Sequence, residues 1–286
     1  MATDMKGKRC LVTGATSGIG RLTAEALAAA GAEVILVGRD PEKTEKVRAE
    51  IAAATGSAEV GVLIADMASL ESIRAFGAAF HERYDRLDVL VNNAGGYNAS
   101  RQETADGFEL TFGVNHLGYF LTTLLLLPAL RAASDARVVS VSSGAHRLAR
   151  PNLDDLQSER GYSALRAYSD SKLFNLHFTF ELAERLRDTA ITANAMHPGA
   201  VASGFGSGPG WFGKVIALAR PFMRTPAKGA ETVIFLAASD EVRGVTGRYY
   251  IDRKPRTPSR AALDAELAGR LWTISEDLVG ARFAAA

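Results

Sequence analysis

The sequence predicts a single doubly wound α/β domain, in which a mostly parallel sheet of seven strands is covered by helices on both faces. Short β-branched runs alternate with longer helical patterns along most of the chain, and no repeat, low-complexity tract or linker divides it. The 286 residues, of which 47% are apolar and 23% charged, are enough to bury one substantial core. We therefore take residues 1–286 as one domain.

The predicted elements follow one another from the N-terminus. Strands are predicted at Arg9–Thr13, Glu33–Val37, Glu59–Ile64, Leu87–Val91, Arg137–Val141 and Ile191–Ala195. Helices are predicted at Arg21–Ala30, Glu42–Ala54, Leu70–Tyr84, Phe108–Ala132, Ala164–Arg187 and, within a C-terminal tail of about 261–280, at Ala261–Leu278. Runs that are apolar on both faces belong to a parallel sheet with helices on each side. Asp40-Pro41 and Thr225-Pro226 each place a capping side chain before a proline at the first helical position.

Two segments depart from this alternation, Ser143–Ala164 and Ser203–Arg224. Both follow strands, and ligands of open α/β sheets bind beyond the carboxyl ends of the strands. We expect both segments to wall a substrate site, with a lid at about residues 203–225 over a lipophilic substrate. The alternative is that the aromatic residues of the second segment only pack it onto the domain or form an oligomer contact.

Composition narrows the classes of partner and the location. The formal net charge is +1 and no long Lys/Arg run is present, so nucleic acid is not expected as a partner. The single cysteine, Cys10, excludes a disulfide framework and fits a buried thiol in a reducing compartment. The apolar stretch Tyr119–Leu130 is shorter than the ~20 residues that cross a bilayer, and the N-terminus has no signal-peptide pattern. We therefore expect a cytoplasmic protein without a membrane span.

A glycine-rich turn joins the first strand to the first helix. Glycines in this position allow a tight turn and a close approach of the backbone to a pyrophosphate, which the helix N-terminus attracts. The residues of this turn expected to contact a dinucleotide are Gly14, Thr16, Ser17, Gly18, Ile19 and Gly20. The spacing is not the common G-x-G-x-x-G, so a purely structural turn is the alternative.

The residue after the second strand bears on which nicotinamide cofactor binds. NAD-preferring sites commonly place an acidic side chain there for the adenosine ribose, whereas this chain has Arg39. An arginine suits a 2′-phosphate, so NADP(H) is preferred and NAD(H) remains possible; a solvated surface arginine is the alternative. Asp66, after the third strand, is expected near the adenine amino group or in a simple turn.

Tyr168 and Lys172 are four residues apart on a predicted helix, which puts both side chains on one face. A free tyrosine titrates near pH ~10, and a neighbouring cation lowers its pKa toward the range that suits a general acid and base. This spacing alone is common in helices. The spacing indicates a catalytic pair only because a nucleotide-binding pattern comes earlier in the chain.

Taken in order, several motifs resemble those of the short-chain dehydrogenase/reductase superfamily over about residues 6 to 252. They are Thr13-Gly14-x-x-x-Gly18-x-Gly20, Asn92-Asn93-Ala94-Gly95, Asn115, Ser143, Tyr168-x-x-x-Lys172 and Pro198-Gly199. The resemblance implies a Rossmann-type fold and an enzyme that acts on CH–OH and C=O groups. Asn152–Leu156, inside a long gap between Ser143 and Tyr168, is similar to the retinol-dehydrogenase-like and WW-oxidoreductase-like branch.

The resemblance also implies a role for each matched residue. Tyr168 would be the general acid and base, and Ser143 would hydrogen-bond the substrate oxygen. The neighbouring Ser142 is the alternative to Ser143 in this role. Lys172 would lower the tyrosine pKa and bind the nicotinamide ribose, and Asn115 would hold a water of a proton relay. The other positions implied near the cofactor are Asn93, Ala94, Gly95, Pro198, Gly199, Val201 and Ser203. His197 is interpreted as structural, because no nucleophile and carboxylate accompany it.

These observations favour an NADP(H)-dependent oxidoreductase that interconverts a carbonyl and an alcohol, with reduction as the expected direction, no metal, and a homodimer as the expected assembly. Two alternatives are left open. One is a catalytically idle NADP-binding sensor or scaffold, although such a protein needs no acid/base tyrosine. The other is an epimerase or dehydratase of the same fold, in which the cofactor is not consumed.

Overall fold

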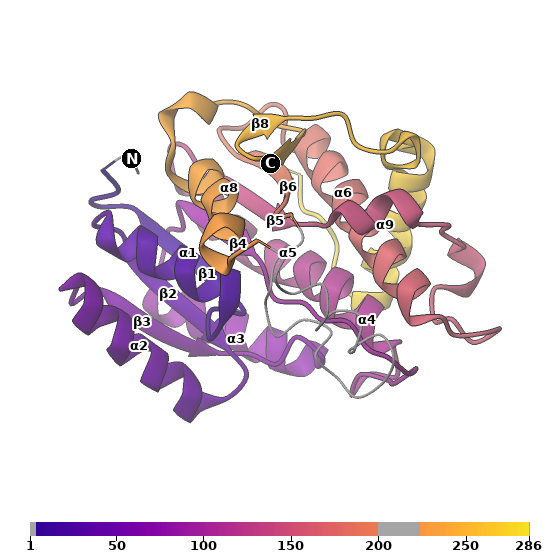
Figure 1. Ribbon diagram of the computed structural model, residues 1–286, viewed down its shortest axis with the longest axis horizontal. Coiled ribbons are helices and arrows are strands. Elements are labelled where there is room, and N and C mark those ends of the chain that lie inside the picture. Colours follow the sequence, from indigo (N-terminus) through magenta and orange to yellow (C-terminus); the bar gives the residue numbers. More distant parts are fainter. Residues whose placement is uncertain (1–3, 200–223, 286) are drawn as a thin grey trace.

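The computed structural model describes residues 4–199 and 224–285, and these form a sheet between two layers of helices (Figure 1). The strands are β1 (Arg9–Thr13), β2 (Glu33–Gly38), β3 (Val60–Ile64), β4 (Val89–Asn92), β5 (Arg137–Val141), β6 (Thr192–His197), β7 (Arg248–Ile251) and β8 (Lys254–Pro255). Their order is β3-β2-β1-β4-β5-β6-β7-β8. All neighbours are parallel except β7 and β8. The predicted seven-stranded sheet is therefore extended by one two-residue antiparallel strand.

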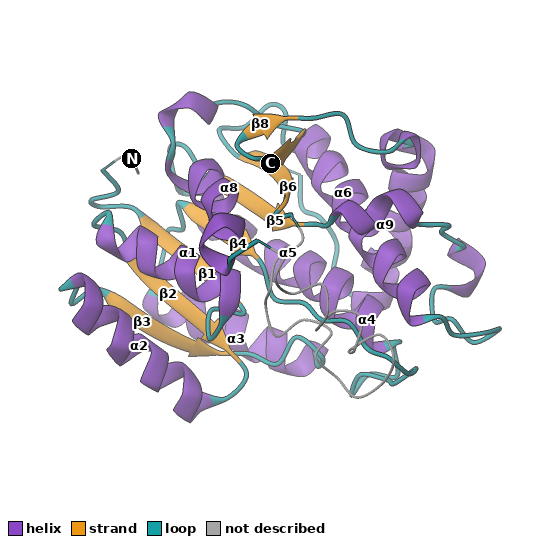
Figure 2. Cartoon of the chain, in the orientation of Figure 1, coloured by secondary structure: helices purple, strands orange, loops and turns teal. Residues whose placement is uncertain are grey.

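The α-helices lie on both faces of the sheet, as Figure 2 shows. They are α1 (Gly18–Ala29), α2 (Pro41–Thr55), α3 (Leu70–Arg83), α4 (Leu110–Phe112), α5 (Gly118–Arg131), α6 (Ala164–Arg185), α8 (Pro226–Ala238) and α9 (Ala265–Val279). One apolar core lies between the sheet and α1, α2 and α8; the other lies beneath α3, α5, α6 and α9. Strand β1 serves both, because Cys10 and Val12 point to the first core and Leu11 to the second.

Side-chain caps mark helix starts where the sequence predicts them. Asp40 accepts a hydrogen bond from the Lys43 N–H at the start of α2, and Thr225 accepts one from the Lys228 N–H at the start of α8. Each cap satisfies a backbone donor that the first helical turn leaves unpaired. Both predicted caps are confirmed.

The apolar helix in the middle of the chain lies within the predicted bounds Phe108–Ala132 and contains an irregular turn. A π-helical turn, η1 (Gly113–Leu117), joins α4 to α5, and Pro128 lies within α5 without ending it. The continuous helix Leu110–Arg131 has 22 residues and is long and apolar enough to cross a membrane. The expectation that no segment could span a membrane is therefore wrong on length and composition. In this fold 78% of the most apolar 18-residue stretch of this helix is buried inside the protein.

Helix α9 covers the apolar faces of α5 and α6. The Trp272 ring stacks on Phe178, with centroids 6.0 Å apart and planes at 7°, and lies edge-on to Phe120 at 4.8 Å. The Arg185 guanidinium lies over the Trp272 ring, 4.5 Å from its centroid. Helix α9 thus covers apolar side chains of α5 and α6, and the expected homodimer stays a prediction.

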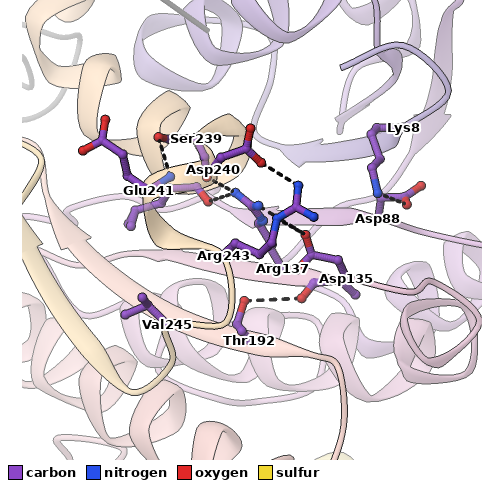
Figure 3. Close-up of polar contacts among 12 residues, drawn as sticks. Lys8, Asp88, Asp135, Arg137, Thr192, Ser239, Asp240, Glu241, Arg243 and Val245 are labelled. Carbon is purple, nitrogen blue, oxygen red and sulfur yellow. Dashed lines mark hydrogen bonds and ion pairs between the residues drawn. The ribbon is translucent and has the colours of Figure 1, made fainter. Parts of the chain in front are cut away.

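The amino-terminal ends of the central strands carry a network of paired charges (Figure 3). Lys8 Nζ lies 3.2 Å from Asp88, and the buried Arg137 guanidinium donates to the Ser239 carbonyl at 2.7 Å and lies 3.3 Å from Asp135. These contacts fasten the end of α8 to the sheet. A cavity of about 270 Å³ borders this network. The buried charges that line the cavity are paired with one another or with backbone groups, so we interpret the cavity as part of the structural contact between α8 and the sheet.

Candidate active site

The glycine turn after β1 is shaped by close backbone contacts. Gly14 and Gly18 have φ of +65° and +55°, in the left-handed region that favours glycine. A Cβ on Gly20 would lie 2.4 Å from both the Gly14 carbonyl oxygen and Asn93 Nδ2. The turn therefore accepts no side chain at Gly20 without moving β4 or itself.

Asn93 joins the ends of β1 and β4, where the strand order reverses. Its Nδ2 donates to the Thr13 carbonyl at 2.8 Å, and its backbone N–H donates to Thr13 Oγ1 at 2.9 Å. The Ala94 N–H donates to the same hydroxyl at 3.0 Å. The predicted cofactor residues Asn93, Ala94 and Gly14 are therefore in one place, in the crevice where doubly wound sheets bind nucleotides.

The start of α1 fits an anionic group. The N-cap residue Ser17 is exposed and its side chain caps no backbone donor, and no acidic residue occupies the first turn. The unpaired amides and the positive end of the helix dipole therefore face outward beside Thr16, Gly18 and Ile19. This donor set suits the pyrophosphate of a dinucleotide.

Arg39 lies exposed immediately after β2, in the place that the sequence predicts. The nearest acid, Asp40, uses Oδ1 to cap α2 through the Lys43 N–H at 3.0 Å. Asp66 Oδ1 likewise accepts from the Ala68 N–H at 2.9 Å, which is the turn role left open by the sequence. Arg39 is thus exposed, and the neighbouring Asp40 caps α2.

The π-helical turn places Asn115 against the loop that follows β4. Asn115 is fully buried; its Nδ2 donates to the Gly96 carbonyl at 2.9 Å, and its Oδ1 accepts from the Gly96 N–H at 2.8 Å. Nδ2 also lies 3.0 Å from Ser171 Oγ on α6. Beside this contact, a Cβ on Gly95 would lie 3.5 Å from Lys172 Nζ. Asn115, Gly95 and Lys172 thus share one small region.

Ser143 and Ser142 end β5 with different partners. Ser143 makes a side-chain hydrogen bond with Tyr168. Ser142 is buried and donates from Oγ to the Lys172 carbonyl at 2.7 Å, which ties the strand to α6. Only Ser143 of the two is therefore arranged to contact a group that Tyr168 also contacts.

Burial controls the pKa values of Tyr168 and Lys172. It raises the pKa of Tyr168 to about 12, against a lowering by the hydrogen bond with Ser143. Burial also lowers the pKa of Lys172 to about 7, and its Nζ donates to the Val141 carbonyl at 3.1 Å. Nζ lies 5.7 Å from the Tyr168 ring centroid. The lowering of the tyrosine pKa expected from Lys172 is thus not seen in the chain alone, where desolvation keeps Tyr168 a phenol at neutral pH.

His197 ends β6 beside the site, followed by Pro198 and Gly199. Its Nδ1 accepts from the Gly144 N–H at 2.9 Å, and burial lowers the pKa of His197 to about 4. Gly199 has φ of +86° and lies against the Arg224 side chain. The predicted cofactor residues Val201 and Ser203, and nearly all of the predicted lid, lie outside the described residues.

Two residues that sequence reasoning missed lie at this site. The Tyr97 ring packs edge-on to Tyr168, with centroids 5.9 Å apart. His146 is buried and its Nδ1 lies 2.6 Å from the Ser143 carbonyl. Tyr97 directly follows Gly95-Gly96, and His146 comes three residues after Ser143. These positions next to predicted site residues were the signals by which both could have been found.

The chain is similar to known proteins over nearly its whole length. The family model of short chain dehydrogenases matches residues 8–207. Retinol dehydrogenase 14 of Mus musculus is 43% identical, with 96% of this chain and 87% of that protein covered, and retinol dehydrogenase 12 of Homo sapiens is 41% identical, with 98% and 89% covered.

Solved structures give the same result. An uncharacterized protein from Mycobacterium paratuberculosis has a TM-score of 0.81 and 35% identity, with 99% of this chain and 97% of that chain covered. A short chain dehydrogenase from Shigella flexneri, complexed with NADP, has a TM-score of 0.70 and 25% identity, with 89% and 100% covered.

The location expected from the sequence is corrected by these findings. The similarity to several retinol dehydrogenases, together with the helix Leu110–Arg131 that could cross a membrane by length and composition, points against a purely cytoplasmic protein. The sequence-based expectation considered only Tyr119–Leu130, which is about half of that helix.

Proposed function

This chain belongs to the short-chain dehydrogenase family, and we propose that it is an NADP(H)-dependent oxidoreductase. In this proposal it interconverts a carbonyl and an alcohol on a small lipophilic substrate. The observation that carries the proposal is the hydrogen bond between Tyr168 and Ser143. It lies at the carboxyl end of the sheet, with Lys172 one helical turn from Tyr168 on α6. Two hydroxyls that share a hydrogen bond can both contact one substrate oxygen.

The chemistry of the chain's own residues follows from their protonation. Tyr168, a phenol at neutral pH, donates its proton to the carbonyl oxygen in reduction and takes it back in oxidation. The Ser143 hydroxyl donates a hydrogen bond to the same oxygen and stabilises the negative charge that develops there. The bound nicotinamide cofactor supplies or accepts the hydride. Lys172 holds the nicotinamide ribose, and Asn115 maintains the loop at Gly95 and Gly96 beside it.

The cofactor is held by the crevice between β1 and β4. The described residues that we assign to it are Gly14, Thr16, Ser17, Gly18, Ile19, Gly20, Arg39, Asp66, Asn93, Ala94, Gly95, Tyr168, Lys172, Pro198 and Gly199. The preference for NADP(H) rests on Arg39, because a guanidinium pairs well with a phosphate and Asp40 is engaged in capping α2.

The lipophilic substrate class has two supports. The relatives at 41% and 43% identity are named for retinol, a lipophilic primary alcohol. The Tyr97 ring against Tyr168 supplies an apolar surface at the reacting group. Primary and secondary alcohols with a long apolar chain, and the matching aldehydes and ketones, are therefore the first substrates to test.

The test follows the absorbance of NADPH and NADH with a panel of retinal, alkyl aldehydes, ketones and quinones. We expect turnover with NADPH that Tyr168→Phe abolishes. Arg39→Ser should raise the KM for NADPH by about 10- to 100-fold, the value of a charge-assisted contact, and leave the KM for NADH within a small factor.

Other outcomes identify the alternatives. Tight NADPH binding with no turnover on any carbonyl would support a sensor or scaffold. Conversion of a substrate without net consumption of NADPH would support an epimerase or dehydratase. If Tyr168→Phe kept wild-type turnover, the assignment of the acid would fail.

A further inference from the structure

One peptide unit next to the proposed active site is held by histidines at both of its polar atoms. The Ser143 carbonyl lies 2.6 Å from His146 Nδ1, and the Gly144 N–H donates to His197 Nδ1 at 2.9 Å. These two groups belong to the same peptide bond. His146 lies in the 3₁₀ helix η2 (Gly144–Leu148), whereas His197 ends β6. One contact is therefore local, and the other comes from a residue 53 positions away in sequence.

The partners define the tautomer of each ring. A carbonyl oxygen only accepts, so His146 carries its proton on Nδ1; its Nε2 then accepts from the Ser259 N–H at 3.1 Å. The Gly144 N–H only donates, so His197 Nδ1 is unprotonated and a neutral ring carries its proton on Nε2. The two neutral rings are thus opposite tautomers, and protonation of either places a donor against a donor.

Packing keeps both rings in place. His146 is 1% exposed and lies edge-on to Tyr249, with ring centroids 5.2 Å apart. His197 lies against Gly144 so closely that a Cβ there would be 3.0 Å from its Nε2. The Ser143 side chain also accepts from the Ala145 N–H at 3.2 Å, so its direction is linked to that of the following peptide.

We propose that His146 and His197 are positioning residues, which hold the Ser143–Gly144 peptide so that the Ser143 hydroxyl stays directed at Tyr168. This inference rests on the proposed function for its catalytic readout. Rotation of that peptide would turn the backbone from which the Ser143 side chain projects. The hydroxyl would then leave the position from which it can bind a substrate oxygen, and misplacement by about 1 Å is enough to slow an enzyme strongly.

The charges around the rings favour the neutral forms. The groups that act on His197 are His146 and Arg147 from η2, Arg224 before α8, and Asp252 after β7; Arg147 also faces His146. Arg224 is paired with Asp252, which leaves burial as the main cause of the low pKa of His197. Acid should therefore release the peptide by protonating His197 near pH 4.

The decisive variants keep or remove the polar atom that contacts the Ser143–Gly144 peptide. In His197→Asn, Oδ1 takes the place of the accepting Nδ1 and cannot be protonated in this range; in His146→Asn, Nδ2–H takes the place of the donating Nδ1–H. We expect kcat for carbonyl reduction to fall by about 10- to 100-fold in His197→Leu and His146→Leu, with KM for NADPH little changed, and to recover in the Asn variants. The wild-type kcat should fall as the pH approaches 4, and His197→Asn should lack this loss.

A measurement without turnover separates this inference from the proposed function. Nitrogen-15 NMR of the wild type should show His146 protonated on Nδ1 and His197 on Nε2 at neutral pH, and the Gly144 amide should exchange slowly in His197→Asn and fast in His197→Leu. Two results would overturn the inference: the opposite tautomers, or equal kcat in folded Leu and Asn variants. Should no carbonyl be turned over, NMR still decides the geometry, and the proposed function alone fails.

Discussion

Lys172 is a buried amine with no carboxylate of the described residues in contact with it. Burial lowers its pKa to about 7 from 10.5 in a free chain. Because the folded pKa is the lower one, this group weakens the fold as the pH drops from ~10 through 7, by up to about 4 kcal/mol near neutrality. The proposed catalytic lysine therefore costs stability, as functional groups in desolvated sites commonly do.

Replacing Lys172 by Met should stabilise the protein at pH 6, by about 2 kcal/mol after the hydrogen bond to the Val141 carbonyl is lost. The gain should shrink toward pH 10, where the wild-type amine is neutral, and turnover should be lost at both pH values. Urea unfolding of the wild type and Lys172→Met at pH 6 and pH 10 measures this difference in the free energy of unfolding. Lys228→Met is the control, since Lys228 is an exposed partner of Glu231 and should matter little. A similar loss of stability at both pH values would contradict this account of Lys172.

At the scale of the element, the glycine turn and the end of β4 act as one unit. Thr13 Oγ1 accepts two backbone N–H groups, from Asn93 and Ala94, and Asn93 Nδ2 donates back to the Thr13 carbonyl. The pattern of glycines indicates the turn, but the need for Gly20 comes from Asn93, which is more than seventy residues away in sequence.

Gly20→Ala should therefore disrupt the turn, because its Cβ would lie 2.4 Å from Asn93 Nδ2 and from the Gly14 carbonyl oxygen. We expect a loss of stability of about 1–3 kcal/mol and at least tenfold weaker NADPH binding, measured by thermal unfolding and fluorescence titration. Gly269→Ala in α9 is the matched control: its Cβ meets no atom within 4 Å, so helix propensity alone should stabilise by about 1 kcal/mol. Unchanged NADPH affinity in Gly20→Ala would show that the turn does not bind the cofactor.

At the scale of the whole molecule, α9 closes the core that α5 and α6 begin. Trp272 is 2% exposed and lies between Phe120 and Phe178 on one side and the Arg185 guanidinium on another. Pairing of two subunits through the side chains that Trp272 covers would require α9 to move away. The expected homodimer stays a prediction.

Trp272→Ala should remove this cover and destabilise the protein by about 3–5 kcal/mol, the usual cost of deleting a buried aromatic side chain. It should also promote self-association through the uncovered apolar face, which sedimentation velocity detects. The exposed neighbour Thr273→Ala should change stability by less than about 0.5 kcal/mol. A fully stable, unassociated Trp272→Ala protein would show that α9 is not required to cover this face.

Local patterns alone indicated much of the fold. Strand β1 and strand β5 begin and end at the predicted residues, and the glycine turn, the Asp40 and Thr225 caps and the spacing of Tyr168 and Lys172 were all readable. These features depend on hydrophobic period, backbone freedom and side chains near in sequence, which a single chain displays directly. The choice of Ser143 over Ser142 came from resemblance, and the hydrogen bond with Tyr168 supports it.

Only the tertiary structure decided the rest. Three features depend on groups distant in sequence: the direction of the Tyr168 pKa, the cover of α6 by α9 and the contact of His197 with the Gly144 N–H. Burial and long-range contact set the cost of a charge and the partner of each polar atom, and neither quantity is a property of a local sequence window.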